Sequence, residues 1–165
     1  AANGASEGLS LALNVAAMLL AFVALIALLN YLIGLIGSLF GFPTLSLQWI
    51  LGKLFSPLAF VMGVPIKDIS IAGSLLGEKI MINEFVAYSS LSNYITEGML
   101  QEKTILILTY ALCGFANISS IAIQIGGIGG IAPNKKSTIA KLGLKTLIGG
   151  ALATCLTDTI AGILF

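Results

Sequence analysis

The chain has 165 residues, of which 58% are hydrophobic and only 9% are charged, and its net charge is +1. A soluble domain carries about 25% charged residues, so this composition excludes a water-soluble fold. It also excludes a nucleic-acid-binding surface, which needs clustered basic residues. We expect an all-α integral membrane protein with one membrane domain over residues 1–165. Because the chain begins without Met and soon enters an apolar run, we expect it to be a fragment.

The first apolar stretch predicts a long transmembrane helix over residues 9–38. No charged residue occurs between Glu7 and Lys53, and about 20 apolar residues are enough to cross a bilayer. The Gly-Phe-Pro-Thr sequence at residues 41–44 ends this helix, since glycine and proline are the strongest breaks in a helical pattern.

A less regular segment follows, and we interpret residues 45–62 as a helix that lies along the membrane interface. Trp49 and Lys53 belong to residue types that favour the boundary between lipid and water. Pro57 disfavours a regular spanning helix. The segment is therefore expected to be amphipathic and not to cross the membrane.

Residues 68–94 contain two short apolar stretches on either side of a polar centre at residues 77–84. Each half has about 10 residues, too few to span a bilayer. We predict a re-entrant helical hairpin with its polar turn held inside protein. Glu78 and Lys79 are expected to pair with each other at this turn, because charges in a membrane usually find a partner.

Residues 104–131 predict a transmembrane helix that is interrupted near its middle. A glycine and three polar side chains occur within residues 114–120, and four more glycines lie between residues 126 and 130. Glycine costs about 1 kcal/mol in a helix interior. An interrupted membrane helix is the best sequence indication of a transport site.

The last transmembrane helix is predicted over residues 139–165. Four lysines near its start indicate that this end is cytoplasmic: Lys135, Lys136, Lys141 and Lys145. Asp158 lies seven residues from the end of the chain. We expect it near the external interface, where a charge costs little, and it argues against a helix that faces only lipid. The protein is thus expected to be a multi-pass protein of the plasma membrane, or of the inner membrane in a bacterium.

Two polar motifs carry a resemblance to a known family. Residues 83–88 read Asn-Glu-Phe-Val-Ala-Tyr, and residues 114–120 read Gly-Phe-Ala-Asn-Ile-Ser-Ser. Together with residues 6–19, 123–129 and 140–145, they resemble the concentrative nucleoside transporters over nearly the whole chain. The resemblance implies homotrimers with two re-entrant hairpins, each paired with a broken helix. This chain would hold the second pair, and the first pair and the sodium site would lie upstream.

Four residues are our principal candidates for substrate binding. Glu84 is an ionisable group expected at mid-membrane, where its cost suggests a function, and its carboxylate can accept hydrogen bonds from ribose hydroxyls. Asn117 and Ser120 are three residues apart, so an intact helix would place them on one face. The resemblance gives all three a nucleoside-contacting role. Phe115 would cover the face of a base or sugar.

Each principal candidate also has a purely structural interpretation. Glu84 would cap a helix or pair with Lys79, Asn117 and Ser120 would satisfy an unwound backbone, and Phe115 would pack against lipid or protein. Three secondary candidates are Asn83, which would cap the hairpin turn, Ser119, which would bond the carbonyl four residues earlier, and Gln124, which would line the path or bridge helices.

The resulting interpretation is a symporter that takes up nucleosides along a sodium or proton gradient. No cofactor, catalytic residue or metal ligand is expected. The chain has no His, and neither Ser119 nor Ser120 has an evident base to activate it. The expected partners are a nucleoside, membrane lipid and two further copies in a trimer. A membrane channel or a non-transporting subunit is the alternative, and saturable, gradient-driven uptake separates them. The choices between sodium and proton and between pyrimidine and purine stay open.

Overall fold

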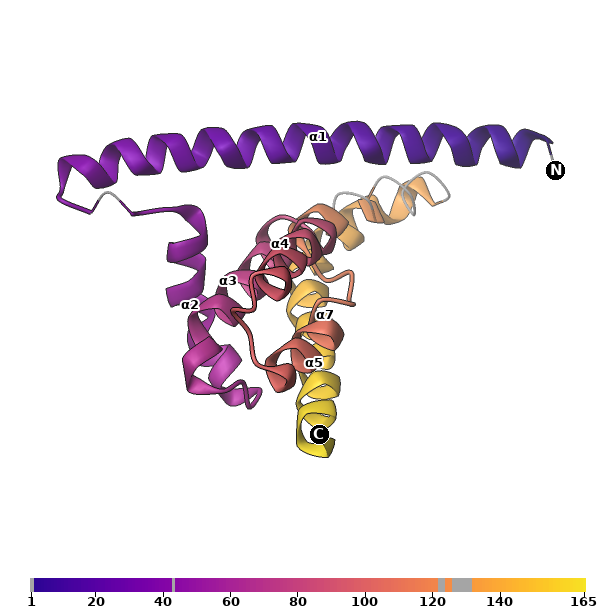
Figure 1. Ribbon diagram of the computed structural model, residues 1–165. Helices are drawn as coiled ribbons and strands as arrows, with labels where there is room; N and C mark the ends of the chain where they lie inside the picture. The colour runs from indigo at the N-terminus through magenta and orange to yellow at the C-terminus, as the bar shows by residue number, and fades with distance from the viewer. Residues whose placement is uncertain (1, 43, 122–123, 126–131) are drawn as a thin grey trace. The chain divides into compact units, whose positions relative to one another are not determined.

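The computed structural model describes residues 2–42, 44–121, 124–125 and 132–165, and throughout these ranges the regular structure is helical (Figure 1). The α-helices are α1 (Ala2–Leu39), α2 (Leu47–Val61), α3 (Ile69–Met81), α4 (Glu84–Thr96), α5 (Glu102–Ala111) and α7 (Lys136–Leu164). Two 3-10 helices are η1 (Ile66–Asp68) and η2 (Pro133–Lys135). Contacts divide the chain into two compact units, Ala1–Leu47 and Gln48–Phe165. The single domain expected from the sequence therefore stays a prediction.

The first unit is the long helix α1 and the turn that follows it. The helix has 38 residues, which corresponds to about 57 Å at 1.5 Å per residue. It begins at Ala2 and not at residue 9, because the alanines and glutamate before residue 9 are good helix formers. The turn uses Gly41, whose φ of 79° suits glycine. Asn30 accepts a hydrogen bond of 2.8 Å from the backbone N–H of Leu47.

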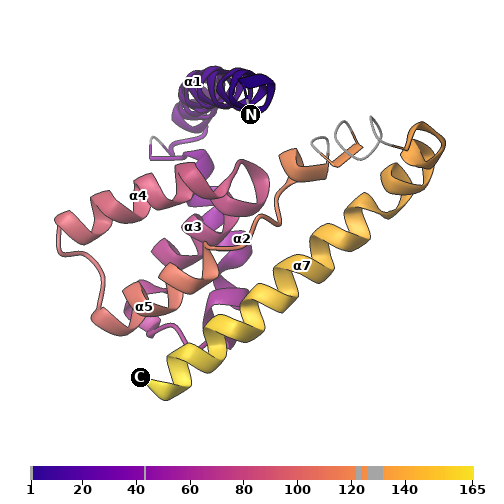
Figure 2. The same cartoon turned by 90° about the vertical axis from the view of Figure 1, so that its right-hand side faces the viewer.

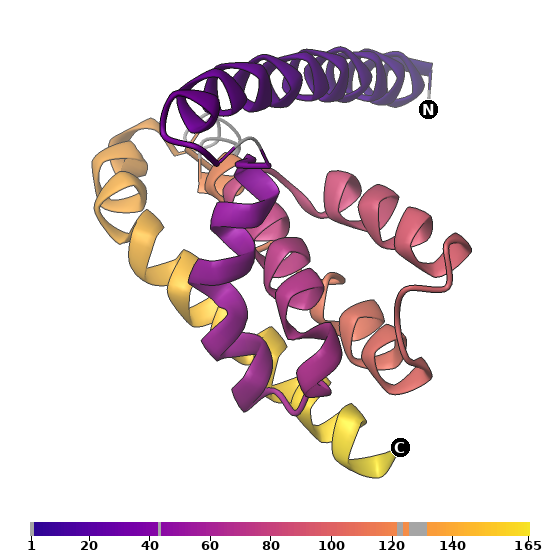
Figure 3. The same cartoon turned by 60° about the vertical axis from the view of Figure 1, so that its left-hand side comes forward.

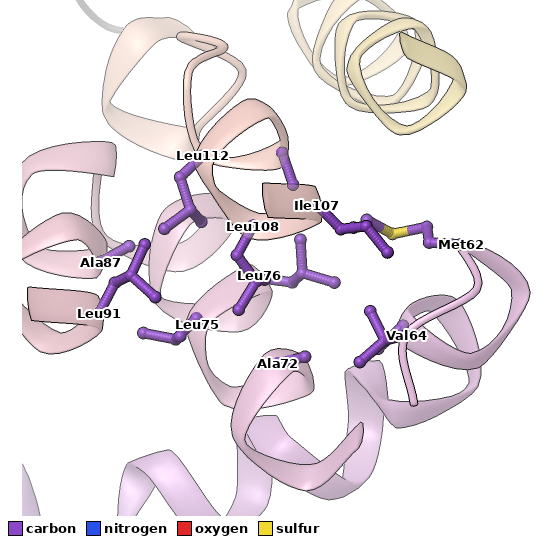
Figure 4. Packing of buried hydrophobic residues seen from close by; sticks show 12 residues of the cluster. Met62, Val64, Ala72, Leu75, Leu76, Ala87, Leu91, Ile107, Leu108 and Leu112 are labelled. Carbon is purple, nitrogen blue, oxygen red and sulfur yellow. The ribbon is translucent and has the colours of Figure 1, made fainter. Parts of the chain in front are cut away.

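The second unit is built around α3, which packs against α4 and α5, while α5 packs against α7. Figure 4 shows the apolar side chains that meet between α3, α4, α5 and the turn that follows α2. The buried cluster consists of Ala59, Met62, Val64, Ala72, Leu75, Leu76, Ala87, Leu91, Ile107, Leu108, Ala111 and Leu112. Lipid tails are as apolar as leucine, so in a membrane such a core stabilises the fold by close packing.

Glycines bring α2 and α3 into close contact, and Figure 3 shows these two helices side by side. A β-carbon on Gly73 would lie 2.6 Å from the carbonyl oxygen of Gly52, so no larger residue fits without a shift of the backbone. Small residues at helix contacts allow this kind of approach in membrane proteins. The predicted interfacial helix is therefore bound to the hairpin along one side, and its placement in a membrane stays a prediction.

The predicted hairpin corresponds to α3 and α4, which are joined through Ile82 and Asn83. Asp68, at the base of α3, holds the hairpin against the start of α5. Its Oδ2 accepts hydrogen bonds from the backbone N–H of Gln101 at 2.9 Å and from the hydroxyl of Thr104 at 2.5 Å. Further along, the Tyr88 hydroxyl donates to the carbonyl of Thr109 at 2.6 Å.

The described part of the predicted broken helix has the expected interruption. Helix α5 ends at Ala111, residues 112–117 are not helical, and helical structure resumes at Ile118. Figure 2 shows α7 running beside α5. Residues 122–123 and the glycine-rich residues 126–131 lie outside the described residues. Pro133–Leu164 is a helix long and apolar enough to cross a membrane.

Candidate functional site

Asn83 caps the helix that begins with the first candidate, Glu84. Its backbone is extended, with φ of −168° and ψ of 169°, and its side chain accepts a hydrogen bond of 2.9 Å from the N–H of Val86. Such a cap satisfies one of the N–H groups left without a partner at a helix N-terminus. The predicted capping role of Asn83 is confirmed, and Glu84 is thereby fixed as the first residue of α4.

Asn117 plays the same role where the broken helix resumes. Its Oδ1 accepts hydrogen bonds of 2.7 Å from the N–H of Ser120 and from the hydroxyl of Ser119. The Ser120 hydroxyl in turn donates to the carbonyl of Asn117 at 2.6 Å. The prediction that Ser119 bonds the carbonyl four residues earlier is wrong, because that residue, Phe115, lies in the interruption and not in the helix.

The two capped helix ends meet through the side chains of Asn117 and Glu84. The Nδ2 amide of Asn117 donates to the Oε2 oxygen of Glu84 at 2.7 Å, joining the tip of the hairpin to the interruption. Two helix N-termini thus lie beside one carboxylate. Each N-terminus carries a partial positive charge, which attracts anionic groups.

The orientation of the Asn117 amide follows from its partners. The backbone N–H of Ser120 can only donate, so the oxygen of the amide must face it and the nitrogen must face Glu84. The amide nitrogen keeps a second N–H. Among the described residues, the other carboxylate oxygen of Glu84 accepts no hydrogen bond. One donor and one acceptor therefore remain at the same place.

A groove beside this cluster contains the other candidates. It has a volume of about 210 Å³ and lies between the interruption and α7. Its lining is formed by Phe115, Ala116, Ser120, Ile121, Gln124, Thr146, Leu147, Gly150 and Thr154. Phe115 is 74% exposed, so its aromatic side chain is open to a ligand. Ser120 belongs both to the groove and to the hydrogen-bonded cluster.

Glu78 and Lys79 do not pair with each other as the sequence suggested. They point to different neighbours, because adjacent residues on a helix do not share a face. Glu78 accepts a hydrogen bond of 3.1 Å from the side-chain amide of Gln48 in α2. Lys79 donates to the carbonyl oxygen of Ala111, the last residue of α5, at 2.5 Å. The hairpin is therefore attached on one side to α2 and on the other to the broken helix.

Asp158 is buried against other parts of the chain, and its expected place near the external membrane interface stays a prediction. Its exposed fraction is 0%. Together with Gly143, Leu147 and Gly162 it belongs to the buried side of α7. The opposite side carries exposed apolar residues such as Leu152 and Leu156. The last helix therefore has one side against protein, as the presence of an aspartate indicated.

Several residues at this site were not identified from the sequence. Thr146 and Thr154 line the groove from α7, and with Gly150 they recur every four residues, a spacing that places them on one helix face. That spacing was the available signal. No sequence signal indicated that Lys79 bonds Ala111. The two residues are 32 positions apart, and their contact depends on how α3 packs against α5.

Comparison with known proteins gives a consistent result. Residues 1–162 match the family described as "Na+ dependent nucleoside transporter C-terminus". The chain is 53% identical over 163 residues to the uncharacterized transporter YutK of Bacillus subtilis, covering 99% of this chain and 40% of that protein. It is 51% identical over 165 residues to the nucleoside permease NupC of Helicobacter pylori, covering 98% of this chain and 40% of that one.

The same likeness extends to three-dimensional structure. A structure of CNTnw in an inward-facing, substrate-bound state superposes with a TM-score of 0.94 at 49% identity, covering 98% of this chain and 40% of that one. The chain thus spans about 40% of the length of these relatives. Relatives of this kind are transporters and permeases. The protein is accordingly an all-α, multi-pass integral membrane protein and not an enzyme.

Proposed function

Because the chain belongs to the sodium-dependent nucleoside transporter family, we propose that it supplies the C-terminal half of a nucleoside-binding site. The whole protein would take up nucleosides along a sodium or proton gradient. The observation that carries this proposal is the 2.7 Å hydrogen bond between Asn117 and Glu84. It brings the two family motifs together at the tip of the hairpin and at the break of the helix.

The chemistry of this pair suits a sugar hydroxyl. A hydroxyl both donates and accepts a hydrogen bond. The remaining oxygen of Glu84 would accept from it, and the second N–H of Asn117 would donate to it. Vicinal ribose hydroxyls would strengthen the contact, since hydrogen bonds to a charged group are worth about 1.5–3 kcal/mol each. Ser120 would extend the polar surface toward the groove.

The groove would receive the planar base of the nucleoside. Phe115 exposes its ring there, and Gln124 adds a side chain with both donors and acceptors. A volume of about 210 Å³ is below the roughly 300–1,000 Å³ of complete ligand pockets. This small size supports a site completed by other parts of the parent protein. Preference between pyrimidine and purine bases would depend on those parts as well.

The coupling ion and the assembly are further parts of the proposal. We infer that the sodium or proton site lies outside these residues, and that no organic cofactor takes part. A homotrimer is proposed on the family resemblance. Energy would come from the ion gradient, with the site facing each side of the membrane in turn.

Uptake of radiolabelled uridine and adenosine by the full-length parent protein in proteoliposomes tests the proposal. The measurement is made with an inward sodium gradient, with an inward proton gradient and with neither. Two variants, Glu84→Gln and Asn117→Ala, are compared with the unmutated protein. Glu97→Gln and Asn134→Ala serve as matched controls, because both residues are exposed and lie outside the motifs.

Saturable uptake that needs one of the gradients, retained in the controls and lost in both site variants, is the expected result. Equal uptake by the parent and the two site variants would show that the binding site lies elsewhere. Uptake that never saturates would favour a channel. Absence of uptake under either gradient would contradict nucleoside transport and leave a non-transporting subunit.

A further inference from the structure

The end of α5 leaves a backbone carbonyl that the helix itself cannot satisfy. In a continuous helix the carbonyl of Ala111 would accept from the N–H of Phe115, but Phe115 lies in the interruption. The ammonium of Lys79 donates to this carbonyl instead, at 2.5 Å. A cation at this position also suits the partial negative charge of a helix C-terminus. Lys79 therefore caps the broken end of the helix from the neighbouring hairpin.

This cap puts an ammonium group in the protein interior, where only 2% of the lysine is exposed. A single carbonyl does not neutralise it, and a buried charge without compensation is costly. The ionisable groups around it are Cys155 and Asp158 from α7, Glu84 from α4, and Cys113 from the interruption. Only two of these are carboxylic acids. Glu84 already accepts the amide of Asn117.

Asp158 is the carboxylate that remains. It is fully buried, and among the described residues neither of its oxygens accepts a hydrogen bond from another side chain. Gly114 connects it to the lysine in space. A β-carbon on Gly114 would lie 3.4 Å from the Lys79 nitrogen and 2.5 Å from Oγ1 of Thr154. Thr154 is one helical turn before Asp158, so this side of α7 faces the lysine.

We propose that Asp158 is the buried counter-ion of Lys79, and that the pair fixes the position of the helix break next to the nucleoside site. Both are positioning residues: Lys79 holds the end of α5, and Asp158 keeps Lys79 charged. The effect on transport rests on the function proposed above. The effect on stability does not, because it follows from burial and charge alone.

A double-mutant cycle on the full-length parent protein tests the pair. The melting temperature in detergent is measured for Lys79→Gln, Asp158→Asn and the double variant. We expect each single change to lower it by about 5 °C or more, because each leaves one buried charge unpaired. The double variant should recover most of the loss, since no charge remains. Lys145→Gln and Glu97→Gln, both at exposed positions, are the matched controls.

A melting temperature for Asp158→Asn equal to that of the parent would overturn the proposal, since a neutral, protonated Asp158 is not a counter-ion. Additive losses in the double variant would overturn it as well. Should the single variants fail to fold, a folded double variant supports the pair, and an unfolded one contradicts it.

The positioning role has its own readout in uptake kinetics. We expect the double variant, once folded, to raise the KM for nucleoside several-fold while its maximal rate changes little, because the break loses its cap and not its substrate contacts. Lys79→Arg, which keeps the charge, should retain more affinity than Lys79→Gln. An unchanged KM would overturn the positioning role. If the unmutated protein transports no nucleoside, the proposed function fails. The double-mutant cycle of melting temperatures still tests whether Asp158 and Lys79 form an ion pair.

Discussion

Asn117 and Glu84 are 33 positions apart, and their side chains share a hydrogen bond of 2.7 Å at the meeting point of two helix N-termini. Asn117 therefore has two separable tasks. Its oxygen caps the resumed helix through Ser120, and its nitrogen faces Glu84. A substitution that keeps one task and removes the other separates stability from binding.

Asn117→Ser is the substitution that makes this separation. Serine is about as good an N-cap as asparagine, so the melting temperature should stay close to that of the parent. The amide donor toward Glu84 is lost, and we expect the KM for nucleoside to rise about tenfold, as for one hydrogen bond to a charged group. Concentration-dependent uptake and thermal melting measure the two effects.

Asn117→Asp provides the complementary comparison. Aspartate also caps well, but it adds a second carboxylate beside Glu84. Repulsion should make this variant weaker in uptake than Asn117→Ser. Equal affinity in the parent and in both variants would mean that the amide does not contact the substrate.

Gly114→Ala is expected to destabilise the contact between the helix break and α7. The added β-carbon would lie 2.5 Å from Oγ1 of Thr154, closer than real β-carbons approach other atoms. Overpacking of this kind costs about 1–3 kcal/mol. Thermal melting of the full-length protein measures the loss, and Thr154→Ala in the same chain should restore part of it.

Gly149→Ala is the matched control for that change. A β-carbon on Gly149 meets nothing within 4 Å, and alanine is the better helix former. Its melting temperature should equal or exceed that of the parent. A loss as large as that of Gly114→Ala would mean that the loss reflects glycine in general and not the contact with Thr154.

Asp68→Ala should loosen the base of the hairpin. The buried carboxylate receives hydrogen bonds from Gln101 and Thr104 at the start of α5. Its removal leaves the Thr104 hydroxyl buried without its acceptor, and we expect a loss of about 1.5–3 kcal/mol in unfolding free energy. Asp68→Asn keeps one acceptor oxygen and should lose less. If denaturant unfolding ranks the two variants in the opposite order, Asp68 does not hold the hairpin to α5 through these hydrogen bonds.

Asn83→Ala should weaken α4 at the residue that precedes Glu84. Loss of an N-cap costs about 0.5–2 kcal/mol, and the first turn that carries Glu84 should fray. Asn83→Asp retains the acceptor for the Val86 N–H and should retain stability. Hydrogen exchange of the amides of residues 84–87 measures the fraying directly. Equal exchange in the parent and in Asn83→Ala would exclude the capping role.

The architecture was largely predictable because composition and breaks decide it. Long uncharged runs, glycine and proline at the breaks, and a polar centre in the hairpin decide how many helices form and in what order. Helix limits were less accurate: α1 begins at Ala2 and α7 at Lys136, earlier than expected. Polar or charged residues at a helix end do not stop the helix, so hydrophobicity alone sets these limits too narrowly.

The partners of polar side chains were predictable only where they are local. Asn83 caps its own helix, and its position before Glu84 indicated this. Lys79 bonds Ala111, and Asp158 lies buried in α7. Both depend on packing between distant segments, which sequence spacing does not encode. The substrate contacts of Glu84, Asn117, Ser120 and Phe115 stay predictions.

Glu78 and Lys79 also fix the rotational phase of α3. Adjacent residues on an α-helix are turned by about 100° from each other, and here one reaches Gln48 while the other reaches Ala111. Inserting or deleting a single residue within residues 69–77 would turn the hairpin tip by that angle and disengage both side chains together. Length changes in this helix should therefore be far less tolerated than substitutions, except in steps close to whole turns.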